Sequence, residues 1–333
     1  MEVLIFKSHR WMLIVFLLFL EGIFLRSESK AQLRILTYES LLGKHGLAPH
    51  LEIRFQELCK KEYPKLSCKL EFVKAQELSG LLGQMRQSAR RKKNVAYQMV
   101  IGLDDDSYAQ ALTEKLVAEG KVFDESPYAI MVDTLKVNDS QRPKSWKELV
   151  TKFPKSLLVQ DPRSSTPGIG WIRSIFEWNL VSTLEAKNLV KRSFPSWTSS
   201  YSAFNQGEAS FVWSYLSSEA YHRCTGKNNE TPRYQALVLE EGYPVQREWL
   251  ARVLLPQAKS EIFYKNLIGI FEKVLFEDDL IQEKIYTTQW MFPVKKDVSV
   301  PECYSKIPKV KRLEKSGSWN ASDIQKWIDE WTL

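Results

Sequence analysis

Beyond residue 31 the chain alternates short apolar strand patterns with amphipathic helix patterns, and this alternation constrains the fold more than any other feature. In the first half we expect strands over 33–37, 68–73, 99–102 and 128–133, and helices over 50–63, 77–91 and 106–118. In the second half we expect strands over 157–159, 211–213 and 244–254, and helices over 168–180, 201–205, 217–223, 261–276 and 278–286. Strands that alternate with helices build βαβ units around largely parallel sheets. The sequence therefore predicts an α/β protein.

The chain is long enough for two lobes. Of its 333 residues, about 300 remain after the N-terminal segment, which is more than one core of the common size needs. No Gly/Ser linker, low-complexity tract or internal repeat divides the sequence, so we expect intertwined lobes and not a tandem pair. A last helix, with Asn320 as its N-cap, is expected to pack against a lobe through Ile324, Trp327, Ile328 and Trp331.

The N-terminal segment 1–31 has the pattern of a secretory signal peptide. A basic start that ends at Arg10 precedes the uncharged run 11–20, and small residues stand at the cleavage-defining positions up to Ala31. Glu21 ends the run short of the roughly 20 residues needed to cross a bilayer. We expect an exported protein cleaved near Ala31, with a retained N-terminal anchor as the alternative.

Charge and composition argue against nucleic-acid binding and resident metals. The net charge of +7 is spread along the sequence apart from the basic runs 90–93 and 306–315, whereas nucleic-acid binding needs a clustered basic face or a known motif. The four histidines have no ligand spacing, and no Cys-x-x-Cys pair is present.

The four cysteines of an exported chain are first interpreted as disulfide partners. Cys59 ends a helix pattern and Cys68 begins a strand pattern, so a bridge between them would staple the helix-to-strand turn. The sequence leaves open whether Cys224 and Cys303 pair or stay free.

Aromatic, acidic and hydroxyl side chains follow the predicted strands. Ligands of open parallel sheets bind outside the carboxyl ends of the strands, so these are the positions to inspect. The residues there, with two further aromatics, are Tyr38, Glu39, Asp104, Ser164, Ser165, Thr166, Trp197, Tyr215, Tyr221 and Trp290. Taken singly, each aromatic is explained as well by a place in the core. Together they indicate a flat, cationic ligand with a polar tail.

The turn 160–168 is the most specific of these stretches. Three hydroxyl residues, Ser164 to Thr166, precede Pro167, which suits the first position of a helix. The unpaired N–H groups of a helix start and the hydroxyls before it can bind a phosphate together. An ordinary N-cap explains the same residues.

These three kinds of group match the three chemical parts of thiamine and its phosphates. An aromatic face attracts a desolvated cation such as a thiazolium by about 2 kcal/mol or more. Glu39 or Asp104 would hydrogen-bond the aminopyrimidine, and Ser164, Ser165 and Thr166 would hold the hydroxyethyl or phosphate tail.

At these residues the chain resembles the periplasmic thiamine-binding protein of bacterial thiamine ABC transporters, a family of type II periplasmic binding proteins. The resemblance covers nearly the whole chain beyond the N-terminal segment. The matching stretches, in order, are 36–40, 100–104, 160–168, 207–209 with 214–215, 220–222 and 290–294. The Gln-Asp-Pro-Arg-x-Ser-Thr-Pro-Gly pattern at 160–168 and Trp-Met-aromatic-Pro-Val at 290–294 are its most specific parts.

The resemblance implies a two-lobed α/β fold, each lobe a mainly parallel sheet flanked by helices, with the ligand between the lobes. The implied lobes are 32–130 with 250–333, and 131–249, joined by strands near 123–133 and 244–254. It implies a periplasmic, monomeric carrier without catalytic activity or cofactor, whose partners are thiamine or thiamine phosphate and an inner-membrane permease. It further implies aromatic contacts from Tyr38, Trp197, Tyr221 and Trp290, Ser165 near the phosphate, and a disulfide close to Cys59 and Cys68.

The chain departs from the family at one wall of the expected cleft. The family carries Phe-Asp-Tyr-Gly where this chain has Phe-Asp-Glu-Ser at 123–126. Other ligands therefore stay open: a thiamine precursor, a polyamine or iron. An exported enzyme similar to type I thiaminase is a further alternative, although it needs a cysteine nucleophile, and none of the four cysteines is well placed for that role.

Overall fold

The computed structural model describes residues 30–75, 80–91, 97–226, 231–254, 261–314 and 321–332. The first 29 residues of the expected signal peptide, and Asn320, lie outside the described residues. The first strand begins at Lys30, so it includes the two residues before the expected start of the mature chain. None of the helices in the described ranges is long and apolar enough to span a membrane.

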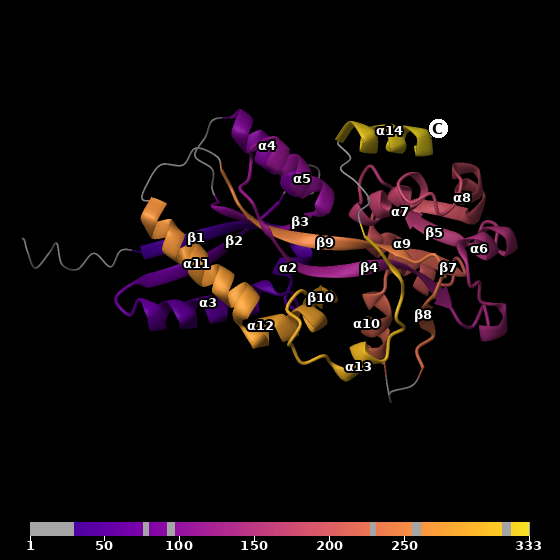
Figure 1. Cartoon of the computed structure of the whole chain (residues 1–333). Helices are drawn as coiled ribbons and strands as arrows, with labels where there is room; N and C mark the ends of the chain where they lie inside the picture. Colours follow the sequence, from indigo (N-terminus) through magenta and orange to yellow (C-terminus); the bar gives the residue numbers. More distant parts are fainter. Residues whose placement is uncertain are drawn as a thin grey trace, which may run out of the picture.

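The first lobe is built on a parallel sheet in the order β2-β1-β3 (Figure 1). Its strands are β1 (Lys30–Thr37), β2 (Ser67–Lys74) and β3 (Met99–Asp104). Neighbouring residues of β1 face opposite sides, because side chains alternate along a strand: Ile35 packs towards α3 (Ala48–Glu62) and α11 (Glu261–Glu277), and Leu36 packs towards α4 (Gly80–Arg90) and α5 (Asp105–Thr113). The sheet is therefore covered on both faces.

The second lobe repeats this plan with a parallel sheet in the order β7-β5-β6. Its strands are β5 (Leu157–Gln160), β6 (Val190–Phe194) and β7 (Phe211–Tyr215). Its helices are α6 (Trp146–Lys152), α7 (Thr166–Phe176), α8 (Thr183–Leu189), α9 (Trp197–Asn205) and α10 (Ser217–Thr225). Trp146, Trp171 and Trp213 are fully buried against one another at its centre.

Two long strands join the lobes. β4 (Lys121–Asp133) pairs with β9 (Tyr243–Arg252) over 121–127 and with β7 over 128–132, both antiparallel. β9 in turn pairs antiparallel with β3. The sheet thus runs through the whole molecule as β2-β1-β3-β9-β4-β7-β5-β6, with both connecting strands at its centre (Figure 1).

The C-terminal part of the chain passes from the first lobe back to the second. It consists of α12 (Asp279–Lys284), η2 (Ile285–Gln289), β10 (Phe292–Pro293), α13 (Glu302–Ser305), β11 (Arg312–Leu313) and α14 (Ala321–Thr332). β10 pairs with β4, α13 packs on α10, and β11 pairs with β9. The expected first lobe included all of 250–333, whereas Ile324 and Ile328 of α14 lie in the core of the second lobe.

The remaining elements are α2 (Glu39–Leu42), η1 (Asp139–Gln141) and β8 (Tyr234–Ala236). Two predicted starts differ from the structure, and one strand was not predicted. The strand expected at 128–133 begins at Lys121. Its first half was not predicted from the strand pattern, because the residues at 124–126 are polar. The helix expected at 201–205 begins at Trp197, and the edge strand β6 was missed because Lys191 and Arg192 face solvent.

Candidate functional site

The carboxyl ends of the strands meet where the two lobes face each other. Asp104 ends β3 and caps α5: its Oδ1 accepts hydrogen bonds from the N–H groups of Asp106 (3.0 Å) and Ser107 (2.7 Å). Its other oxygen, Oδ2, accepts a hydrogen bond of 3.0 Å from Thr166 Oγ1 at the start of α7. The aspartate expected after the third strand and a hydroxyl of the expected anion turn are therefore in direct contact across the lobes.

Tyr38, at the end of β1, contacts both a connecting strand and the C-terminal segment. Its hydroxyl donates to Glu248 Oε2 of β9 over 2.7 Å and lies 2.9 Å from Gln289 Oε1 of η2. The ring passes over Gly102, where a Cβ atom would lie 2.0 Å from Tyr38 Cε1. The absence of a side chain at Gly102 therefore leaves room for the ring of Tyr38, one of the residues expected to contact the ligand.

Two further tyrosines converge on one amide from the second lobe. The hydroxyls of Tyr128 and Tyr215 donate to Gln246 Oε1 over 2.6 and 2.9 Å, and their rings stack with centroids 5.2 Å apart. Burial raises the pKa of Tyr38, Tyr128 and Tyr215 well above the usual value, so all three remain neutral phenols that can donate hydrogen bonds.

The expected aromatic contacts form a chain along the second lobe. Trp197 stacks on Tyr201 (4.8 Å) and its Nε1 donates to Ser214 Oγ over 2.8 Å. Tyr201 lies 2.9 Å from His222 Nε2, and desolvation lowers the pKa of that imidazole to about 4, which leaves it neutral. Tyr221, next to His222, meets Trp290 edge to face with ring centroids 5.0 Å apart.

The structure brings most of the expected site residues together, but not all. Glu39 is an exception, since its side chain is 69% exposed and pairs with Lys74 over 2.9 Å. Ser164 donates to the carbonyl of Pro195 on the surface, and Ser165 is the N-cap of α7 without a side-chain cap hydrogen bond. The acid that contacts Tyr38 is Glu248, which sequence reasoning missed; its signal was an acid in the middle of a connecting strand, next to Gln246 and Arg247.

All four cysteines are paired. Cys59 and Cys68 join the end of α3 to the start of β2, which confirms the expected disulfide. Cys224 of α10 and Cys303 of α13 form a second disulfide, which answers the question that the sequence left open. The second bridge fixes α13 on the helix that carries Tyr221.

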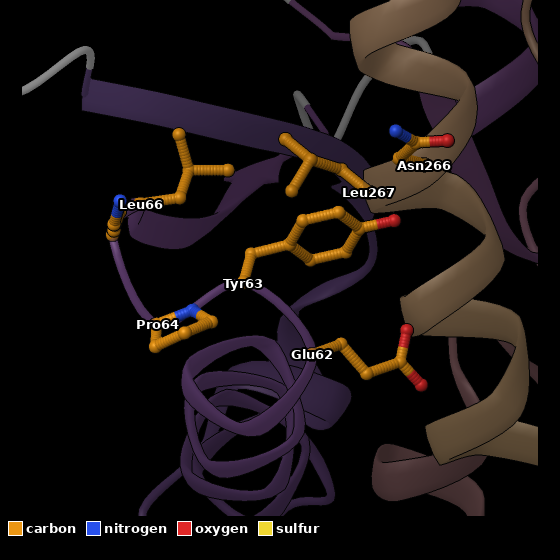
Figure 2. Close-up of a pocket in the computed structure, with 7 residues that line it drawn as sticks. Glu62, Tyr63, Pro64, Leu66, Asn266 and Leu267 are labelled. Carbon is orange, nitrogen blue, oxygen red and sulfur yellow. The ribbon is translucent and has the colours of Figure 1, made fainter.

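A surface pocket of about 520 Å³ lies elsewhere, between the turn after α3 and helix α11 (Figure 2). It is lined by Glu62, Tyr63, Pro64, Lys65, Leu66, Asn266 and Leu267. The turn leads into the start of β2, so the pocket is at the opposite end of the parallel strands from Tyr38 and Asp104. It is not the site that the strand ends build.

The chain is similar to known proteins over nearly its whole length. The "Thiamine-binding periplasmic protein" of Salmonella typhimurium is 29% identical over 331 residues, which cover 91% of this chain and 93% of that protein. Its counterpart in Brucella melitensis is 28% identical over 332 residues, 92% of each chain. A solved structure titled "Periplasmic thiamin binding protein" superposes with a TM-score of 0.71 at 26% identity, covering 92% of this chain and 96% of that one.

The chain is a homologue of the thiamine-binding periplasmic proteins. This homology confirms the resemblance, the periplasmic location and the type II periplasmic-binding-protein fold that the sequence predicted. The ferric binding protein of Campylobacter jejuni, with a TM-score of 0.62 at 13% identity, shares the fold alone. No protein-family model matches the chain.

Proposed function

We propose that this protein is the substrate-binding component of an ABC importer, which captures thiamine or a thiamine phosphate between its lobes and delivers it to an inner-membrane permease. The observation that carries the proposal is the meeting of Tyr38, Asp104, Thr166 and Tyr215 at the strand ends of both lobes, in a homologue of proteins named for thiamine binding. The protein acts as a monomer in this proposal.

Each part of the ligand has a matching group. The aromatic rings of Tyr38, Trp197, Tyr215, Tyr221 and Trp290 supply faces for the pyrimidine and the thiazolium. Asp104 and the newly found Glu248 supply acceptors. The start of α7, with Ser165 and Thr166, supplies hydroxyls and a helix N-terminus for the tail.

Capture follows from movement of the lobes about β4 and β9. These strands are the continuous connections at the centre of the sheet, and in hinge closure around a ligand a few connecting residues absorb the change in φ and ψ. We assign 32–130 and most of 250–313 to the first lobe, 131–249 to the second, and place α14 with the second because it packs on α7.

Calorimetric titration with thiamine, thiamine monophosphate and thiamine diphosphate tests the proposal. We expect saturable binding of one ligand per chain, and scattering profiles that contract when ligand is added. Tyr221→Ala should weaken binding at least tenfold, about 1.4 kcal/mol. Tyr63→Ala, in the separate pocket of Figure 2, is the matched control and should leave the affinity unchanged. The absence of binding heat with all three ligands would overturn the proposal.

The disulfides favour binding over catalysis by a cysteine nucleophile. All four cysteines are oxidised, so none offers the thiolate that a type I thiaminase mechanism requires. Incubation with thiamine and a nucleophilic base should release no thiazole. Spermidine and ferric ion serve as competitors in the titration, and displacement of thiamine by either at equal concentration would shift the assignment to that ligand.

A further inference from the structure

Three carboxylates stand in one row across adjacent strands of the central sheet. Asp104 of β3 is in register with Glu248 of β9, and Glu248 is in register with Asp124 of β4. Residues directly opposite each other on antiparallel strands have their side chains on the same face of the sheet. Like charges in that position destabilise a sheet, so the row needs a physical reason.

None of the three carboxylates forms an ion pair with a cationic side chain among the described residues. No lysine or arginine in the described part of the chain forms an ion pair with Asp104, Glu248 or Asp124. Arg247, the neighbour of Glu248 in sequence, is engaged by other acids, namely Asp105, Glu125 and Glu314.

Asp124 is the most unusual of the three. Its side chain has no solvent exposure, and neither carboxylate oxygen has a hydrogen-bond partner among the described residues. A buried carboxylate without partners is costly, and most buried polar groups in proteins are hydrogen-bonded. Asp124 lies in a connecting strand and has no partner within the described ranges. It is therefore suited to pair with a ligand, which occupies the site only part of the time.

The other titratable groups that face the row are acids and phenols. Those interacting with Glu248 or Asp124 are Tyr38 from β1, Asp104 from β3, Glu125 from β4, Tyr215 from β7 and Tyr304 from α13. Tyr38 donates a hydrogen bond to Glu248 and Thr166 donates one to Asp104, so these two members of the row are stabilised by hydrogen bonds and not by cations.

We propose that Glu248 and Asp124 are the counter-ions for the fixed positive charge of the ligand, and that a carboxyl proton of this pair leaves to solvent when the cation binds. The assignment rests on the proposed function and specifies it: the site selects a permanently cationic ring over a neutral ring of the same shape. The exchange is balanced, because one O–H bond breaks, one proton is released, and the ligand charge replaces it. Both residues are in the strands that join the two lobes.

The titration behaviour of the pair agrees with this geometry. Desolvation first, and then the charge of Asp104, raise the pKa of Glu248 to about 7. Desolvation and the charges of Glu248 and Glu125 raise the pKa of Asp124 well above its usual value. In the empty protein below pH 7, this pair therefore holds at least one proton that a cation can displace.

The test measures thiamine affinity by calorimetry from pH 5.5 to 8.5 in buffers of different ionisation enthalpy. For the natural protein we expect affinity to rise by up to tenfold per pH unit until about pH 7 and then to level, with up to one proton released below pH 7. Glu248→Gln and Asp124→Asn should each weaken binding at pH 8 at least tenfold, and Glu248→Gln should reduce the proton release. The ligand's own titration is common to all variants and cancels in the comparison.

Glu71→Gln is the matched control, because it removes one carboxylate from β2, three strands away from β9 in the same sheet, where Glu71 pairs with Arg34 over 2.8 Å. It should keep the pH profile of the natural protein. Glu248→Asp should restore part of the proton release that Glu248→Gln loses. Circular dichroism and thermal unfolding establish that each variant is folded before its affinity is interpreted.

A neutral isostere separates charge recognition from shape. In 3-deazathiamine a thiophene replaces the thiazolium, and we expect the natural protein and Glu248→Gln to bind it with equal, weak affinity. Equal weakening of thiamine and 3-deazathiamine by Glu248→Gln would overturn the assignment in favour of a structural role. Thiamine binding with an unchanged pH profile in Glu248→Gln and Asp124→Asn would overturn it while leaving the proposed function intact. Failure of the natural protein to bind thiamine at any pH would overturn both.

Discussion

Thr166 Oγ1 donates a hydrogen bond of 3.0 Å to Asp104 Oδ2, and this contact joins the start of α7 in the second lobe to the start of α5 in the first. The same aspartate caps α5 through its other oxygen. The arrangement of the lobes is therefore tied to a group that already has a local structural role.

Thr166→Val should shift the empty protein towards an open form. Valine keeps the shape of threonine but removes the donor, and a hydrogen bond to a charged group is worth about 1.5–3 kcal/mol. We expect a larger radius of gyration by small-angle scattering without ligand, and contraction to the natural value at saturating ligand. Thr151→Val, which removes a helix-surface hydroxyl bonded to the carbonyl of Lys147, is the control and should scatter like the natural protein. Identical scattering of Thr166→Val and the natural protein would show that this contact does not hold the lobes.

The empty protein should be more stable at pH 5 than at pH 8 through Glu248. Its pKa is about 7 in the folded protein and about 4.5 when unfolded, so the folded state binds more protons between these values. Stability consequently falls as pH rises from about 4.5 to about 7 and levels above, by a loss on the order of 3 kcal/mol at about 1.4 kcal/mol per pKa unit. Urea unfolding of the natural protein and Glu248→Gln checks this, and parallel pH profiles for the two proteins would contradict it.

The fold could be predicted from sequence because strand and helix periods repeat along the chain. Leu33 and Ile35 alternate with Leu36 in burial environment, as a strand covered on both faces requires, and their pattern is local. The strand pattern alone does not show the first half of β4, because Asp124, Glu125 and Ser126 are atypical of a buried strand; the family resemblance implied a connecting strand near 123–133. Their place in the sheet is decided by pairing with β9, which is distant in sequence.

The candidate site was predictable where a residue follows its own strand. Tyr38, Asp104 and Tyr215 were proposed in this way, and in the structure they contact Glu248, Thr166 and Gln246, respectively. Glu39 follows a strand as well, but it begins α2 and turns outward to Lys74. Glu248 was not found because it lies within a strand, and only the register of β9 between β3 and β4 places it at the centre.

Gly102→Ala should disturb the site through Tyr38. Gly102 has φ of +94°, which L-residues rarely adopt, and an added Cβ would lie 2.0 Å from Tyr38 Cε1. The ring must move, so its hydrogen bond to Glu248 is lost and thiamine affinity should fall at least tenfold by calorimetry.

Gly269→Ala in α11 is the control, since its Cβ would meet nothing within 4 Å. That change should stabilise the protein by about 0.5–1 kcal/mol and leave the affinity unchanged. Natural affinity in Gly102→Ala would show that the position of Tyr38 is immaterial.

Removal of the Cys224–Cys303 disulfide should weaken both stability and binding. The bridge closes a loop with a sequence separation of 79, which corresponds to about 4.5 kcal/mol in the chain-entropy model. It also holds α13 against α10 in the small cluster to which Trp290 packs, beside Tyr221. We therefore expect the double variant Cys224→Ser, Cys303→Ser to melt at lower temperature and to bind thiamine at least fivefold more weakly at a temperature where it is fully folded.

The other disulfide provides the comparison that separates the two effects. Cys59–Cys68 spans a sequence separation of only 9, about 2.5 kcal/mol in the same model, and lies at the far end of the first lobe from the strand ends. Cys59→Ser, Cys68→Ser should lose stability but keep its thiamine affinity, because no aromatic contact of the site depends on that turn. Equal loss of affinity in both double variants would mean that the lower stability of the fold, and not the position of α13 on α10, sets the geometry of the Tyr221–Trp290 pair.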